Sequence, residues 1–185
     1  SSQPFGWWLI TGAGGIGKSR LALEVCRDAF GWRGGFLPHD EIDSFDWTTW
    51  QPDFPTLLVV DYTKAKPEAV GRMLNQLRLR ADNRPLDAPV RVLLLERHRD
   101  DEPWWDSMLG AGDRHGMLGC LHASEPLTLD ALTDDQLWAI ITAVADTERA
   151  DAIGRGAVIE QLNAIDPHRR PLFALLTGEA IQAGG

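Results

Sequence analysis

The sequence GAGGIGKS, residues 12–19, combines residue types that bind phosphate groups. Its four glycines leave the backbone bare, so successive N–H groups can approach phosphate oxygens and positive φ angles are accessible. The ammonium of Lys18 would neutralise oxygens of the β- and γ-phosphates, and the hydroxyl of Ser19 would bind Mg²⁺. An apolar run over 7–11 precedes the loop and a helical pattern follows it. The start of that helix would add a partial positive charge.

The spacing matches the Walker A pattern GxxxxGK[ST], with the loop placed between a predicted strand and a predicted helix. The alternative, a flexible glycine-rich turn, has no need of a lysine and a serine at those positions. We therefore predict that ATP or ADP is bound by the loop and the residues that follow it: Gly12, Gly14, Gly15, Gly17, Lys18, Ser19 and Arg20.

A second acidic group is needed to hold the Mg²⁺ ion, and Asp61 is the candidate. It ends the apolar run TLLVVD, residues 56–61, which is typical of a strand buried on both faces of a parallel sheet. We predict that Ser19 and Asp61 hold the metal; alternatively, Asp61 caps a turn. Because a predicted helix and strand intervene between Lys18 and Asp61, we expect the additional-strand arrangement, with the Asp61 strand beside the loop's strand.

Arg97 follows another buried run, VRVLLLE at 90–96, and would lie at the same edge of the sheet. From there its guanidinium could bind the γ-phosphate through two hydrogen bonds. We therefore predict Lys18, Asp61 and Arg97 as the catalytic residues. In the alternative interpretation, Arg97 is a solvated residue that pairs with a nearby acid: Glu96, Asp100 or Asp101.

Strand and helix patterns alternate through most of the chain. Strands are expected at 7–11, 34–37, 56–61, 90–95 and within 120–129; helices are expected at 18–30, 67–80, 133–146, 150–165 and 171–183. This order predicts an α/β P-loop NTPase fold: an open, mostly parallel sheet with helices on both faces, followed by a small helical subdomain. We expect the nucleotide-binding domain at 1–130 and the helical subdomain at 131–185.

Composition excludes several classes of function. The chain of 185 residues has a formal net charge of −9, which argues against a broad nucleic-acid footprint because such binding requires many cations. No apolar run approaches the roughly 20 residues of a membrane helix. The cysteines and histidines show no zinc spacing. The two cysteines stand far apart, so we expect a reducing, cytoplasmic setting. The first residues, SSQP, contain neither an initiator Met nor a signal peptide, so we expect a fragment of a longer polypeptide.

Motifs spread over nearly the whole chain resemble the STAND class of P-loop ATPases. That class includes the plant disease-resistance and apoptotic NB-ARC proteins and many bacterial defence and regulatory proteins. The resemblance rests on LITGAGGIGKSRLALE, TLLVVDY, VLLLERH, EPLTLDALTDDQ and RRPLFALL. It implies that Asp61 is the Walker B acid, that Arg97 is the sensor at the end of the fourth strand, and that Pro171 belongs to a GLPL-like motif that packs near adenine.

The sequence departs from the family at two positions. Arg169 stands where the GLPL-like motif has its glycine. Tyr62 follows Asp61, where the family often has an acid that positions the attacking water. Glu96, at the end of the neighbouring strand, could supply that acid or could pair with a nearby arginine.

The resemblance implies a regulatory switch that binds ATP or ADP with Mg²⁺ and hydrolyses ATP slowly, within a signal-transduction protein that has protein partners or self-assembles. Two alternatives remain open. One is a small-molecule P-loop kinase whose acceptor site lies in residues 31–55 or 100–116, and the other is a degenerate P-loop module that serves protein interaction. The eight tryptophans are predicted to pack loops onto the core, with a partner surface as the alternative. Lys64 and Lys66 are interpreted as solvated or as reaching a phosphate.

Overall fold

The computed structural model describes residues 3–83, 86–99 and 103–184. Asp100 and Asp101, two of the acids considered as partners of Arg97, lie outside these residues. The chain divides into two compact units, one of Ser1–Thr11 and Lys18–Thr128, the other of Gly12–Gly17 and Leu129–Gly185. Within the described ranges, no helix has both the length and the apolar character needed to cross a membrane.

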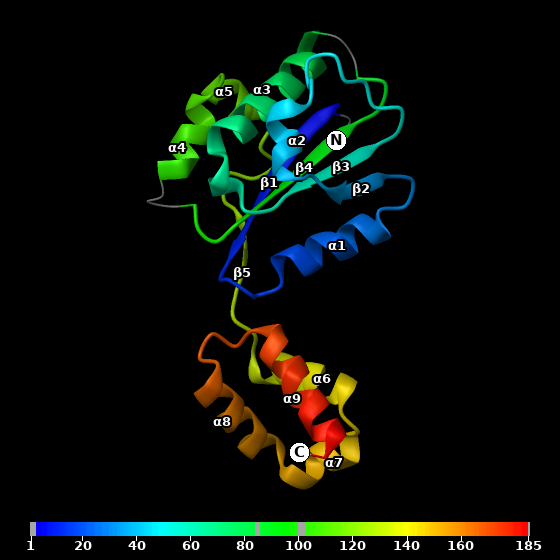
Figure 1. Cartoon of the computed structure of the whole chain (residues 1–185), viewed down its shortest axis with the longest axis vertical. Helices are drawn as coiled ribbons and strands as arrows, with labels where there is room; N and C mark the ends of the chain where they lie inside the picture. Colours follow the sequence, from blue (N-terminus) through cyan, green and yellow to red (C-terminus); the bar gives the residue numbers. More distant parts are fainter. Residues whose placement is uncertain (1–2, 84–85, 100–102, 185) are drawn as a thin grey trace. The chain divides into compact units, whose positions relative to one another are not determined.

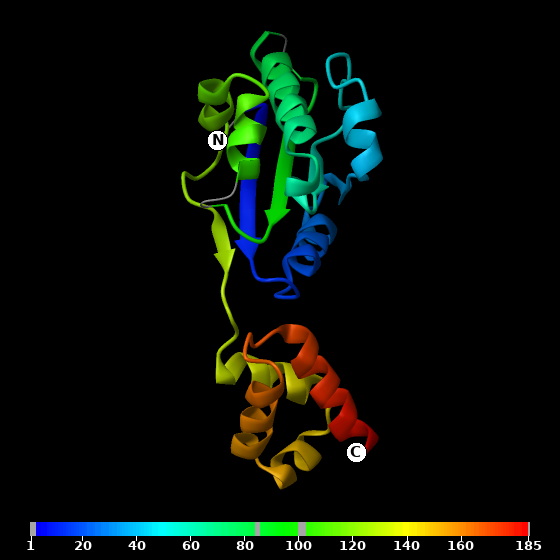
Figure 2. The same ribbon diagram turned by 60° about the vertical axis from the view of Figure 1, so that its left-hand side comes forward.

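A five-stranded sheet occupies the centre of the first unit, in the order β2-β3-β4-β1-β5 (Figure 1). The pairs β2–β3, β3–β4 and β4–β1 are parallel, and β1 and β4 run side by side in the same direction (Figure 2). The strands are β1 Phe5–Gly12, β2 Arg33–Phe36, β3 Thr56–Val60, β4 Val90–Glu96 and β5 Leu127–Leu129.

The order of the strands corrects one expectation. The strand that ends before Asp61, β3, does not lie beside β1, because β4 is inserted between them. In the register, Val60 is opposite Leu94 and Thr11 is opposite Glu96, so β1, β3 and β4 end at the same edge of the sheet. The inserted strand is the additional strand that was expected, and its last residue, Glu96, lies between the end of β1 and the end of β3.

Helices cover both faces of the sheet (Figure 1). One face packs against α2 to α5 in a single core, to which alternate strand residues contribute: Phe5, Trp7, Leu9, Val60, Val90, Val92 and Leu94. Successive side chains of a strand point to opposite faces. Ile10, Leu93 and Leu95 are buried outside that core, on the face where α1 contacts β2 and β4. The helices are α1 Lys18–Asp28, α2 His39–Ser44, α3 Pro67–Asn83, α4 Pro103–Gly110 and α5 Arg114–Gly119.

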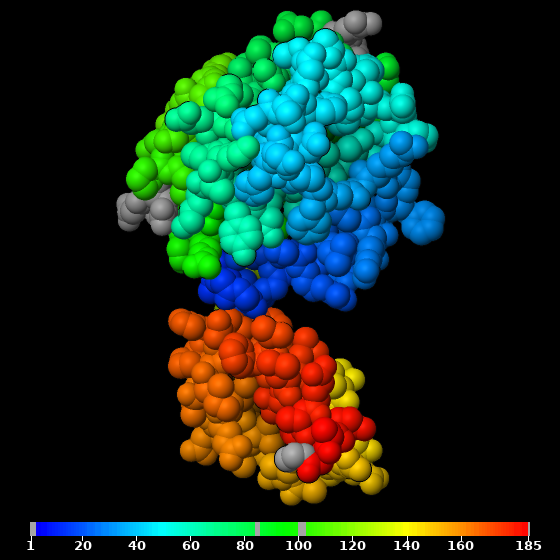
Figure 3. Space-filling view, in the orientation of Figure 1, coloured from blue at the N-terminus to red at the C-terminus, as the bar shows by residue number. Residues whose placement is uncertain are grey.

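Three of these helices, α2, α4 and α5, lie where the sequence predicted no element, because they are short and carry few periodic apolar residues. The segment of α2 and the chain after it cover one side of the first unit in the space-filling view (Figure 3). The predicted helix 18–30 was too long: α1 ends at Asp28, and Phe30 is 99% exposed.

All eight tryptophans are buried or half-buried. Trp47 is buried and its ring contacts the rings of Phe45 and Trp50. Trp104 is buried and contacts Trp105 edge-on. These rings pack loops and short helices onto the core, in agreement with the first of the two interpretations.

The second unit contains the helices α6 Asp134–Val144, α7 Thr147–Ile153, α8 Arg155–Ile165 and α9 Pro171–Ala183. The single helix expected at 150–165 is in fact two helices, separated at Gly154, where φ is +92°. Helices α6 and α9 approach each other closely at Gly178. A Cβ at this position would lie only 2.8 Å from the carbonyl oxygen of Ile141. Their buried apolar residues form a separate core with those of α7 and α8.

Candidate functional site

The loop between β1 and α1 has a backbone that requires glycine at several positions. Gly12, Gly15 and Gly17 have φ angles of +150°, +80° and +107°, a region that side chains disfavour. At Gly12 a Cβ would also lie 2.7 Å from the carbonyl oxygen of Leu129. Three of the four glycines of the predicted phosphate-binding loop are therefore also required by its local geometry.

Lys18 is the first residue of α1 and is buried, with 8% of its surface exposed. Burial lowers the pKa of its ammonium below the ordinary value, an effect that the negative charges of Asp61 and Glu96 oppose and the positive charge of Arg97 reinforces. The structure thus brings Lys18 within electrostatic range of both carboxylates and of Arg97.

Ser19 and Asp61 are in direct contact, although 42 positions separate them in the sequence. The Ser19 hydroxyl donates a hydrogen bond of 2.5 Å to Oδ2 of Asp61, while Oδ1 of Asp61 accepts the N–H of Tyr62 at 2.9 Å. A hydroxyl and a carboxylate are suitable ligands for Mg²⁺, which usually retains several waters and takes few protein ligands. The described residues contain no cluster of three or more His, Cys, Asp or Glu that would hold another metal.

The structure shows a contact of Asp61 that sequence reasoning missed. Nε2 of His39, at the start of α2, lies 2.7 Å from the backbone oxygen of Asp61. The ammonium of Lys66 binds both the carbonyl of His39 and the carboxylate of Asp43, at 3.0 and 2.7 Å. Lys66 therefore holds α2 against the turn after β3. No local pattern could have indicated this, because the partners come from two distant segments.

Glu96 is buried, with 2% of its surface exposed. Its Oε2 accepts the N–H of Lys64 at 2.9 Å, and its Oε1 accepts the N–H of Arg97 at 2.7 Å. Both bonds join Glu96 to backbone N–H groups. The side chain of Arg97 is exposed at the end of β4.

Two further residues predicted to bind nucleotide are Arg20 and Pro171. Arg20 is exposed and pairs with Glu24 one turn later in α1, at 2.6 Å. Pro171 is the first residue of α9. In the second unit, which includes the loop 12–17, the Cγ of Pro171 lies 3.9 Å from the position that a Cβ on Gly17 would take.

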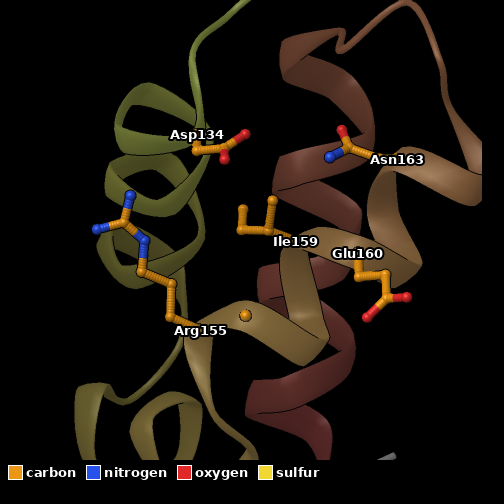
Figure 4. Close-up of a pocket in the computed structure, with 6 residues that line it drawn as sticks. Asp134, Arg155, Ile159, Glu160 and Asn163 are labelled. Atoms are coloured by element: carbon orange, nitrogen blue, oxygen red, sulfur yellow. The ribbon is translucent and has the colours of Figure 1, made fainter.

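A depression of about 450 Å³ in the second unit is a different candidate (Figure 4). It is lined by Asp134, Arg155, Gly156, Ile159, Glu160 and Asn163. Three of its polar side chains are bound to other protein groups: Arg155 pairs with Asp135, while Asp134 and Asn163 accept hydrogen bonds from Arg169. These interactions stabilise the helical unit, and we assign no ligand to the depression.

No protein-family model matches the sequence, and no curated protein matches it either. Among solved structures, that of the P216G mutant of RuvB from Thermotoga maritima is similar at 16% sequence identity with a TM-score of 0.47. The match covers 95% of this chain and 62% of that one, so this chain spans less than two thirds of the RuvB chain. The chain's own strand order and its strand–loop–helix give it an α/β fold of the P-loop NTPase type.

Proposed function

We propose that this chain binds ATP and ADP with Mg²⁺ and acts as a regulatory switch with slow ATP hydrolysis. The observation that carries the proposal is the contact between Ser19 and Asp61 at 2.5 Å, next to the buried Lys18. A structural turn has no need of this combination of a hydroxyl, a carboxylate and a desolvated cation at the end of a glycine loop.

Each group has a distinct part in the proposal. Lys18 neutralises the β- and γ-phosphates, the Ser19 hydroxyl and Asp61 hold Mg²⁺, and the bound metal screens the charge that develops during phosphoryl transfer. Arg97, exposed at the end of β4, donates hydrogen bonds to the γ-phosphate, which only ATP has. Pro171 packs near the adenine.

The role as a regulatory switch goes beyond nucleotide binding, and it rests on the resemblance of the motifs to STAND ATPases. Under this proposal, residues 1–130 bind the nucleotide and residues 131–185 respond to it. A ligand can shift a conformational equilibrium only by its difference in affinity for the two states, and the γ-phosphate supplies such a difference. The response would pass to protein partners or to self-assembly in a longer signalling protein.

Calorimetry with Mg·ATP and Mg·ADP tests the nucleotide site. We expect Lys18→Ala to weaken binding at least tenfold, equivalent to about 1.4 kcal/mol, because it removes the main cation facing the phosphates. Arg114→Ala is the control, since Arg114 is an exposed cation of α5 that pairs with Asp106. Equal affinity of wild type and Lys18→Ala would refute the site.

Analysis of the products separates the remaining functions. The switch ATPase yields ADP and phosphate, a kinase yields a phosphorylated acceptor, and a degenerate module binds no nucleotide. The described parts of the two segments suggested for an acceptor site contain α2, α4 and the start of α5. Ile42 of α2 and Trp104 and Met108 of α4 belong to the core. No observation favours the kinase.

A further inference from the structure

We propose that Glu96 is a positioning residue of the nucleotide site, which joins the turn after Asp61 to the backbone of Arg97 and thereby sets the preference for ATP over ADP. This inference rests on the proposed function. It assigns to Glu96 a different task from that of the water-orienting acid which the sequence suggested.

The sheet places Glu96 between the two parts of the site. It ends β4, which lies between β1 and β3. Its register partner is Thr11, the last residue but one of β1. Glu96 therefore lies between the end of β1 and the end of β3.

The two oxygens of Glu96 bind two separate segments. Oε1 accepts the N–H of Arg97, and Oε2 accepts the N–H of Lys64 in the turn after Asp61. A carboxylate that is 2% exposed requires such donors, because an unpaired buried charge is costly. Since both oxygens are engaged and enclosed, the geometry favours positioning over activation of a water molecule.

The turn held by Glu96 needs external support. Tyr62 has φ +51° and ψ +50°, a left-handed conformation that costs a non-glycine residue roughly 1 kcal/mol. The next residues, Thr63–Ala65, form one turn of 3₁₀ helix, whose first N–H groups have no acceptor within the helix. Glu96 supplies one such acceptor. The buried Thr63 adds a second tie, with its hydroxyl 3.4 Å from the carbonyl oxygen of Leu95.

The bridge connects the residue that holds Mg²⁺ to the residue that meets the γ-phosphate. Asp61 immediately precedes the turn, and Arg97 follows Glu96 directly. A shift of the Arg97 backbone on binding of a γ-phosphate would therefore displace Lys64 through the same carboxylate. ADP lacks that group, so the bridge affects binding of the two nucleotides unequally.

The test distinguishes the effect of the length of the Glu96 side chain from the effect of its negative charge. Glu96→Asp keeps the negative charge next to Lys18 but is one methylene too short to bind both N–H groups. We expect it to lower the preference for Mg·ATP over Mg·ADP, measured by calorimetry on the whole chain, at least fivefold, with less than a twofold change in ADP affinity. Glu68→Asp, at an exposed site in the first turn of α3, is the control and should match wild type.

A double-mutant comparison distinguishes positioning from general loss of structure. If Glu96 acts through Arg97, Glu96→Asp should not lower the ATP preference further in an Arg97→Ala background. Circular dichroism and melting curves check the fold of each variant. Should Glu96→Asp fail to fold, Glu96→Gln takes its place in the same comparison, because it keeps the length and loses one of the two acceptors.

The outcomes divide cleanly. An unchanged ATP preference in the folded Glu96 variant, or an equal loss with and without Arg97, overturns this inference while the nucleotide site stands. A wild-type chain that binds neither nucleotide overturns the proposed function, and the role of Glu96 with it.

Discussion

Arg169 has a backbone conformation that glycine adopts more easily. Its φ is +54°, and it occupies the position where the GLPL-like motif of the resembling family has glycine. Its guanidinium donates hydrogen bonds to the carbonyl of Leu132, to Asn163 and to Asp134. The side chain thus binds the start of α6 and the end of α8, which offsets the strain of the left-handed backbone.

A pair of substitutions at Arg169 separates strain from hydrogen bonding. Arg169→Ala and Arg169→Gly both lose the three hydrogen bonds, but only glycine also relieves the strain. We expect both variants to be less stable than wild type, with Ala less stable than Gly by about 1 kcal/mol. Denaturant unfolding measures the difference. A glycine variant that is no more stable than the alanine variant would show that the position carries no backbone strain.

The connection between α8 and α9 depends on Asp166, a fully buried residue. Its Oδ1 accepts the Nε of Arg170 at 2.9 Å, and its Oδ2 accepts the Arg170 backbone N–H at 2.6 Å. Burial alone would raise the pKa of the Asp166 carboxyl, but the hydrogen bonds and the charge of Arg170 outweigh it and hold the pKa below its ordinary value. The ionised carboxylate therefore holds the start of α9 against the end of α8.

This pairing makes the stability of the helical unit dependent on pH. Because the pKa of Asp166 is lower in the folded state, its contribution is complete above the unfolded value of about 3.9 and is lost as the pH falls through the folded value. We expect Asp166→Asn to cost about 2 kcal/mol at pH 7, and the difference from wild type to shrink below about pH 4.

Denaturant unfolding across this pH range tests the prediction at Asp166. The exposed Asp135, which pairs with Arg155, provides the control, and Asp135→Asn should stay within about 0.5 kcal/mol of wild type. A cost of Asp166→Asn that is the same at pH 7 and at pH 3 would mean that the charge of the carboxylate is irrelevant.

Turnover is a property of the whole molecule under the proposed function. The groups for binding phosphate and metal are brought together, but Tyr62 cannot serve as a carboxylate, and both oxygens of Glu96 accept backbone N–H groups. We therefore expect ATP hydrolysis below about 1 s⁻¹, against a usual enzyme median of roughly 10 s⁻¹. Asp61→Asn should lower it further because a neutral amide binds Mg²⁺ more weakly than a carboxylate does.

The substitution Tyr62→Asp should leave the rate unchanged or raise it. Aspartate tolerates the left-handed conformation of this position, φ +51°, better than tyrosine does. A steady-state assay of phosphate release measures all three proteins. Tens of turnovers per second for the wild type would contradict the switch and favour a dedicated catalytic enzyme.

The sequence by itself determined the features that depend on neighbouring residues. The spacing of the glycines, Lys18 and Ser19 predicted the strand–loop–helix, because a loop with bare N–H groups next to a helix start is encoded within eight positions. The apolar runs before Asp61 and Arg97 predicted β3 and β4, because a strand that is buried on both faces needs continuous apolar residues.

Only the tertiary structure decided which distant groups meet. Strand order, with β4 inserted between β1 and β3, leaves no trace in local periodicity, because all central strands have equally apolar sequences. The contacts of Glu96 with Lys64 and of His39 with Asp61 join residues 32 and 22 positions apart. The physical reason is that a buried polar group forms hydrogen bonds with the groups that lie next to it in the folded chain. The residues adjacent to Glu96 or His39 in the sequence do not indicate which distant group that will be.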